Sequence, residues 1–222
     1  MLLLKRITLS YIYKQNTNNN FKEYIHLNDY NYHSPIFQDF TIYNEFYNSL
    51  GKKHIIRTLM EEHQVILNFL EVLGKLVKDI KHKTSINDSQ EILKDIKSIS
   101  GHLLRTEKHH IREEHTFVRR LVSMAEYVPS QEIRKQHDNL GVLKRKLERT
   151  IYGIYTEPFD DFQKELQSVS RKLIKDLKSH MNIEENILYP QAVKLIPDKD
   201  RWKKMRKEYE NIGYCCFTPG KK

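Results

Sequence analysis

The chain has 222 residues, of which 30% are charged and 7 are glycine, and this composition favours a helical domain over a strand-rich one. The formal net charge is +9, but the basic residues are spread over predicted helix faces without a basic-aromatic motif, so we expect no nucleic-acid partner. No stretch approaches the roughly 20 apolar residues that cross a bilayer, and the apolar run Met1–Leu4 is too short for a signal core. We therefore expect no membrane partner, and the absence of a CxxC pair or a secretory pattern favours a cytoplasmic compartment.

Residues 1–50 differ from the rest of the chain. They are rich in Asn and Tyr and show no sustained helical period. A partly ordered extension that packs on the following domain and a flexible tail both fit this pattern. We expect an irregular N-terminal extension over 1–50, a helical domain over 51–196, and a C-terminal helix with a basic tail over 197–222.

From about residue 52, apolar residues recur at alternating steps of three and four, as on the inward face of a bundle helix. The first predicted helix ends at the turn residues 84–89, the second runs from about 88 to 124, and the third from about 130 to 155. A fourth begins at Pro158, and a short fifth runs from Pro197 to about 212. The pattern predicts an all-α protein, an antiparallel up-down four-helix bundle with a short C-terminal fifth helix.

Each of the four long helices places a histidine on its apolar stripe: His63, His109, His137 and His180. One such histidine is more often an ordinary core or surface residue. Four of them, one on each helix, require a common partner, because uncompensated polar groups inside a core cost several kcal/mol each.

Two of the histidines are followed one helical turn later by a glutamate, His109 by Glu113 and His180 by Glu184. At this spacing both side chains project from the same helix face. The two segments repeat the pattern H-x-x-x-E-E-x-x-F/L, and each preceding helix supplies one lone histidine, which indicates an internal duplication of a helical hairpin. In an up-down bundle all four histidines fall at the same end, within a layer on the order of 10 Å thick.

Imidazoles and carboxylates without a thiolate suit iron or manganese better than structural zinc. Six ligands are too many for one tetrahedral ion, and they are about right for two ions with an open position. The sequence therefore predicts a dinuclear metal site.

The segments Met60-Glu61-Glu62-His63, His102 to Glu114, Gln136-His137-Asp138 and His180 to Pro190 resemble the hemerythrin-like HHE cation-binding domains over roughly residues 54–216. The closing Ile212-Gly213-Tyr214-Cys215 is similar to the end of a prokaryotic branch of that family. The resemblance implies two non-haem, carboxylate-bridged iron ions, with manganese or zinc as alternatives. It implies four terminal histidine ligands and two bridging glutamates, which are His63, His109, His137, His180, Glu113 and Glu184.

The chain departs from the oxygen-carrying hemerythrins at Gly141, where they have a second histidine on the third helix. We expect His102, seven residues before His109, to complete the site as a ligand or as a hydrogen-bonding partner. His54 is a weaker candidate, and His110 replaces His109 if the helical register is off by one.

The residues outside the ligand stripe have simpler interpretations. Glu114 and Glu185 are interpreted as hydrogen-bonding or surface groups. Cys215 and Cys216 are either redox-active or packed against the bundle, and the second interpretation is favoured because no acid-base partner is evident in the sequence.

These features favour a protein that binds or senses dioxygen, a related small molecule such as nitric oxide or peroxide, or iron itself. The alternative is a di-iron oxidoreductase or iron-centre repair protein that consumes peroxide or nitric oxide. A helical bundle with purely structural histidines is the third possibility, and the oligomeric state stays open.

Overall fold

In the computed structural model, residues 40–124 and 130–221 are described, and within these ranges the regular secondary structure is entirely helical. The helices are α2 (Phe40–Ser49), α3 (Ile55–Ile80), α4 (Gln90–Leu104), α5 (Glu107–Glu113), α6 (Arg119–Val122), α7 (Ser130–Gly153), α8 (Phe159–Ile183), α9 (Tyr189–Leu195) and α10 (Lys199–Ile212). A short 3-10 turn, Asn87–Ser89, precedes α4. The prediction of an all-helical protein is confirmed for the described part of the chain.

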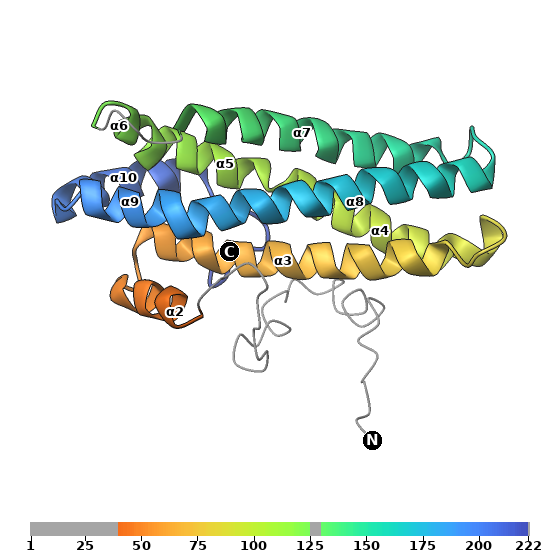
Figure 1. The fold of residues 1–222 in the computed structure, drawn as a ribbon, viewed down its shortest axis with the longest axis horizontal. Coiled ribbons are helices and arrows are strands. Elements are labelled where there is room, and N and C mark those ends of the chain that lie inside the picture. Colours follow the sequence, from red (N-terminus) through yellow and green to blue (C-terminus); the bar gives the residue numbers. More distant parts are fainter. Residues whose placement is uncertain (1–39, 125–129, 222) are drawn as a thin grey trace, which may run out of the picture. The chain divides into compact units, whose positions relative to one another are not determined.

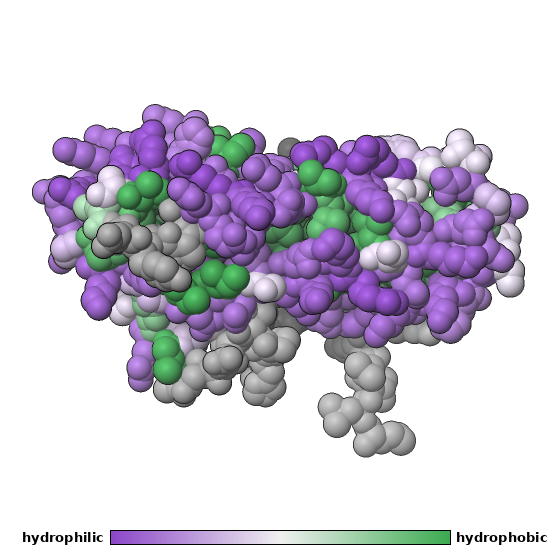
Figure 2. Space-filling model, turned by 45° about the horizontal axis from the view of Figure 1, so that its top comes forward, coloured by the Kyte–Doolittle hydropathy of each residue, from purple (hydrophilic) through white to green (hydrophobic). Residues whose placement is uncertain are grey.

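Four helical segments lie side by side in a bundle (Figure 1). Helix α3 packs against α4 and α8, and α7 packs against the same two helices, so the contacts close a ring. The predicted apolar stripes fill the inside of this ring, and the buried side chains include Leu59, Ile66, Leu70, Leu73, Ile96, Ile99, Leu140, Leu147, Leu166 and Leu173. The surface in Figure 2 is mostly hydrophilic, with hydrophobic residues in separate patches. Burial of the stripes is therefore what holds the bundle together.

The predicted second helix, 88–124, is interrupted in the structure. Helix α4 ends at Leu104 and α5 begins at Glu107. Between them the backbone N–H groups of Thr106 and His109 bond to carbonyl groups three residues earlier, which is 3-10 geometry. Because a 3-10 turn has 3.0 residues and an α-helical turn has 3.6, α4 and α5 do not continue a single α-helical register.

A π-helical segment begins at or directly after the glutamate of each repeated H-x-x-x-E motif, at Glu114–Val118 after Glu113 and at Glu184–Leu188 with Glu184 itself. The additional residue in a π turn moves the apolar stripe by one position. Ile187, which is seven residues after His180 and would share its face in a continuous α-helix, is 44% exposed, and the neighbouring Leu188 is fully buried instead. The two π segments lie at positions of the repeat that agree to within one residue, which supports the internal duplication.

Helix α2 lies in the segment for which the sequence predicted no helical period. Its side chains Tyr43, Phe46 and Tyr47 pack against the core that also contains buried Leu50. Ten residues form fewer than three turns, which is too short for a periodic signal to stand out. Residues 1–39, most of the expected N-terminal extension, lie outside the described residues.

The predicted fifth helix is α10, which buries Met205 and Tyr209 against α3 and α5. It ends at Gly213, whose φ of 87° is the left-handed conformation that favours glycine. The segment after it buries Cys215, Phe217 and Thr218. No helix in the described ranges combines the length and apolar character needed to span a bilayer.

Candidate metal centre

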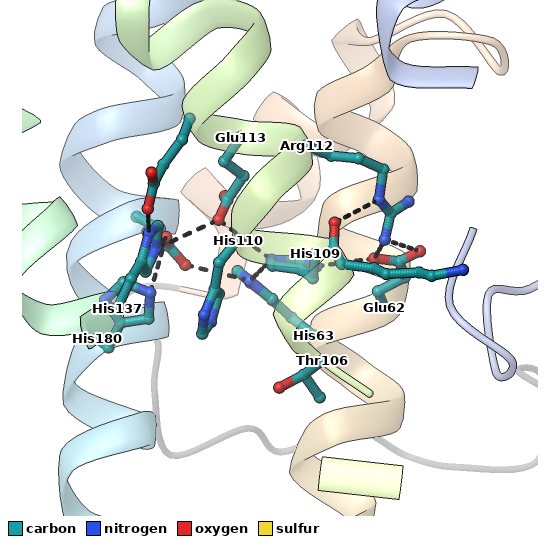
Figure 3. Close-up of polar contacts among 12 residues, drawn as sticks. Glu62, His63, Thr106, His109, His110, Arg112, Glu113, His137 and His180 are labelled. Atoms are coloured by element: carbon teal, nitrogen blue, oxygen red, sulfur yellow. Dashed lines mark hydrogen bonds and ion pairs between the residues drawn. The ribbon is translucent and has the colours of Figure 1, made fainter. Parts of the chain in front are cut away.

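The four stripe histidines are buried in the bundle, His63 on α3, His109 on α5, His137 on α7 and His180 on α8. Glu113 and Glu184 are fully buried between them, at the junctions where α5 and α8 pass into the π segments. Figure 3 shows the four histidines and Glu113 converging from different helices. The structure thus brings together the six residues that the sequence pattern selected.

The outer ring nitrogen, Nδ1, of each histidine meets an oxygen acceptor on a neighbouring helix. The distances are 2.8 Å from His63 to Glu185, 2.7 Å from His109 to Glu62, 2.6 Å from His137 to Glu114, and 2.9 Å from His180 to Gln136. Carboxylate and amide oxygens accept hydrogen bonds, so each Nδ1–H donates. A neutral imidazole then carries a free lone pair on Nε2, as histidine ligands of metals do.

The inner nitrogens, Nε2, point toward one another and toward the two glutamates. The Nε2 atoms of His63 and His109 are 3.0 Å apart, and Nε2 of His180 lies 2.9 Å from Glu184 Oε1. Nε2 of His137 lies 3.4 Å from the same oxygen. Two groups of potential ligand atoms result, one with His63 and His109 and the other with His137 and His180, and both groups include Glu113 and Glu184. Within each group the ligand atoms lie within 4.8 Å of one another.

Several buried polar atoms of this cluster make no hydrogen bond of good geometry within the described ranges: Glu113 Oε2, Glu184 Oε2 and His180 Nε2. Two of them have only close ion-pair contacts, at 2.9 Å from His180 Nε2 to Glu184 Oε1 and at 3.3 Å from Glu184 Oε2 to His63 Nε2. Leaving such groups unsatisfied costs roughly 1–3 kcal/mol each, and more when the group is charged. A cation between them satisfies all three at once. The donor set therefore fits metal ions, and its nitrogen and oxygen atoms suit iron or manganese.

Protons balance the charges of the cluster when it holds no cation. Burial lowers the pKa of His63, but Glu184 and Glu185 more than offset this and raise it to about 10. Burial likewise lowers the pKa of His137, whereas Glu114 and Glu184 raise it to about 9. Metal ions must displace these protons, because a ligating imidazole is neutral.

The two glutamates titrate in opposite directions because they lie close together. Burial and the charge of Glu184 raise the pKa of Glu113 well above its usual range. Burial also opposes the ionisation of Glu184, but His180, His137 and His63 hold its pKa well below the usual range. Like charges in one buried site produce this separation.

A second buried network supports His109 from the outside. Arg112 donates from Nη2 to both oxygens of Glu62, at 2.9 and 2.6 Å, and Thr218 donates to Glu62 Oε1. Arg112 also donates from Nη1 to the hydroxyl of Tyr209. These bonds fix the carboxylate that orients His109 (Figure 3).

Cys215 is packed into this network, with its sulfur 3.1 Å from Arg112 Nη2. Burial raises the pKa of its thiol to about 12, which keeps the thiol protonated. Cys216 is exposed, and its Sγ lies 3.4 Å from His102 Nδ1.

His102 is not brought to the cluster. Its ring stacks on Phe69, with centroids 5.0 Å apart. Seven residues would place His102 on the face of His109 in a continuous α-helix, but the interruption between α4 and α5 removes that relation. His54 is also outside the cluster, because it caps α3 by accepting a hydrogen bond from the Ile56 N–H.

His110 is buried, and its ring stacks parallel to that of His137, with centroids 4.1 Å apart. Together with His137 and His180 it forms a third group of potential ligand atoms. His110 thus joins the site beside His109 rather than replacing it. A Cβ at Gly141 would lie 3.3 Å from Arg145 Nη1 and 3.4 Å from Glu107 Oε2, so these side chains occupy the space beside Gly141.

Sequence reasoning missed three buried groups near the cluster. Tyr189 donates from its hydroxyl to Glu113 Oε1 at 2.5 Å. Lys144, one heptad after His137 on α7, donates to Thr106 and Glu107 at 2.5 and 2.7 Å. The third missed group is Glu62, which appeared in the segment Met60-Glu61-Glu62-His63 without an assigned role. A lysine on an apolar stripe was the signal for Lys144, and no periodic signal marks Tyr189.

Comparison with known families agrees with this geometry. The family model of the hemerythrin HHE cation binding domain matches residues 54–192, a range that contains the six clustered residues. A search of curated proteins finds no match. Because the match covers more than half of the chain, the protein belongs to the hemerythrin HHE cation-binding family.

Proposed function

We propose that this protein binds a pair of non-haem iron ions and uses them to bind or sense dioxygen or a related small molecule. His63 and His109 hold one ion, His137 and His180 hold the other, and Glu113 and Glu184 lie between the two. The observation that carries the proposal is that the two ligand groups share both glutamates. We also infer that the four long helical segments form an antiparallel up-down bundle, since this arrangement places all four histidines at one depth.

Iron ions, when bound, supply open coordination positions and one-electron chemistry. The residues of the chain hold and orient them, and the Nδ1 hydrogen bonds fix each imidazole in the tautomer that a ligand needs. All six clustered side chains are at most 3% exposed. Burial on this scale favours molecules as small as dioxygen, nitric oxide or peroxide.

His110 completes the second ion in the absence of a histidine at position 141. It contributes a third imidazole beside His137 and His180. In the second half of the internal duplication, Met181 stands at the position that corresponds to His110. The ion held by His63 and His109 has fewer imidazoles, so the two ions differ in reactivity.

Anaerobic reconstitution with ferrous iron followed by metal analysis tests the proposal. The wild-type chain should hold two iron ions, and exposure to dioxygen should change its optical spectrum. His137→Ala should lower the content to about one ion, while Glu184→Ala should weaken both ions because both groups share this carboxylate. His102→Ala is the matched control and should keep both ions. Less than one iron ion per wild-type chain contradicts the proposal.

A second function follows if His110 only stacks on His137, because the third-helix histidine missing at Gly141 then leaves a coordination position for a reacting molecule. In this alternative the protein is an oxidoreductase or an iron-centre repair protein that consumes peroxide or nitric oxide. Many turnovers of either molecule, lost in Glu113→Ala and Glu184→Ala, would establish it. Binding without turnover supports the first function.

A further inference from the structure

The internal duplication is broken at a residue that faces the candidate site. Residues of the first H-x-x-x-E segment correspond to residues 71 positions later, as His109 does to His180 and Glu113 to Glu184. By this correspondence Tyr189, the first residue of α9, takes the place of Val118. One half of the site therefore has a phenol where the other half has an aliphatic side chain.

The phenol is fully buried and its ring is held in place. Its centroid lies 5.7 Å from that of His63 with the two rings nearly parallel, and Phe117 contacts it edge-on with centroids 5.9 Å apart. The hydroxyl oxygen lies 2.5 Å from Glu113 Oε1 and 3.3 Å from His63 Nε2. Packing thus aims the hydroxyl at the pair of atoms assigned to the first ion.

The hydrogen bonds leave Nε2 of His63 and the phenol oxygen facing each other. Nδ1 of His63 faces Glu185, and the single hydrogen of the tyrosine hydroxyl is directed at Glu113. In the metal-free protein a proton on Nε2 lies between this nitrogen, the phenol oxygen and Glu184 Oε2, which is 3.3 Å from Nε2. A bound metal ion takes the place of that proton, because a ligating imidazole is neutral.

The distances match those between ligands of one ion. Two donor atoms at about 2.1 Å from an ion, and at right angles, are about 3.0 Å apart. The distance of 3.3 Å from the Tyr189 oxygen to His63 Nε2 is close to this value, as is the 3.0 Å between the Nε2 atoms of His63 and His109.

We propose that the phenolic oxygen of Tyr189 is a further ligand of the ion held by His63 and His109. This inference rests on the proposed function. Binding breaks the phenol O–H bond and forms one oxygen–metal bond, the proton passes to solvent water, and no electrons are transferred. Tyrosine oxygen is an established ligand of protein-bound iron in haem enzymes, and anionic oxygen suits ferric iron well.

The test uses the full-length chain loaded with ferric iron, with metal analysis alongside visible absorption. A tyrosine oxygen bound to ferric iron gives a charge-transfer band in the visible, and resonance Raman excitation in that band enhances tyrosine ring modes. We expect both signals in the wild type, and a shift of the enhanced modes after growth with ring-deuterated tyrosine.

Tyr189→Phe should lose the band while retaining iron, and Tyr214→Phe, which removes a hydroxyl bonded to Glu210, should keep it. If Tyr189→Phe does not fold, site-specific 3-fluorotyrosine at position 189 preserves the shape of the ring and should shift the band, whereas the same residue at position 214 should not.

A wild-type chain that holds two ferric ions without the band overturns the inference and leaves the proposed function standing. A band that persists in Tyr189→Phe, or that does not shift with fluorotyrosine at position 189, also overturns it. Iron content below one per chain overturns the proposed function together with this inference.

Discussion

Replacement of Glu185 tests the hydrogen bonds that orient the ligands. Glu185 accepts from His63 Nδ1 at 2.8 Å, and both side chains are almost completely buried. Glu185→Gln preserves the shape and an acceptor oxygen but removes the charge. Glu185→Leu removes the acceptor, so that His63 is free to adopt the tautomer with a proton on Nε2.

The size of the effect follows from what each variant retains. Loss of a partner that orients a metal ligand typically costs 10–100-fold in metal affinity. An amide already fulfils this role at Gln136, which accepts from His180. We therefore expect Glu185→Gln to weaken binding about tenfold, or about 1.4 kcal/mol, and Glu185→Leu about 100-fold, or about 2.7 kcal/mol.

Competition with a chromophoric chelator under anaerobic conditions measures these affinities. Glu71→Gln is the matched control, because Glu71 is exposed and pairs with Lys75 on the same helix. The weakening should appear in one of two binding steps, since Glu185 contacts only one of the four histidines. Equal affinities for Glu185→Leu and the wild type would refute the reasoning.

Three further predictions concern the remaining groups of the site. His110→Ala should lower the iron content from two toward one ion per chain by metal analysis, and an unchanged content would show that His110 only stacks on His137. Gly141→Ala should raise the free energy of unfolding by up to about 1 kcal/mol in urea titrations at unchanged iron content, because alanine is the better helix former and the tip of Arg145 can move away from the new Cβ. The pKa values of His63 and His137 are raised to about 10 and about 9 in the folded, metal-free protein. The protonated forms of both side chains therefore stabilise the folded state fully below about pH 6.5, and this contribution is lost as the pH rises through the two raised values. Because metal binding competes with the same protons, the difference in melting temperature between loaded and metal-free protein should widen from pH 7 to pH 9, and a narrowing would contradict this.

The ligand set followed from the sequence because it lies on regular helix faces. Apolar residues at steps of three and four fixed the inward stripe of α3, and His63 lies on that stripe. The spacing of four between histidine and glutamate placed both side chains on one face in α5 and in α8. The buried face of a helix can be predicted from the sequence wherever the α-helical period of 3.6 residues is maintained.

The rest of the site lies where that period fails. The 3-10 geometry at Thr106 separates His102 from the face of His109, and no proline in the sequence announces it. The π turn after Glu184 exposes Ile187 and brings Tyr189 to the cluster. Glu114 and Glu185 reach histidines of the other hairpin, a relation that only the packed bundle creates.

The differences between the two halves of the duplication bear on whether the protein carries dioxygen or uses its metal site for sensing or peroxide chemistry. The duplicated hairpins alone would give two equivalent ions, but His110 and Tyr189 have no counterparts in the other half, where Met181 and Val118 stand. Reversible dioxygen binding needs a readily accessible ferrous state. An anionic phenolic oxygen on one ion stabilises the ferric state instead, because it adds negative charge to a buried, low-dielectric site. Ligation by Tyr189 would therefore favour sensing or peroxide chemistry over reversible oxygen carriage, and its spectroscopic test bears on that choice.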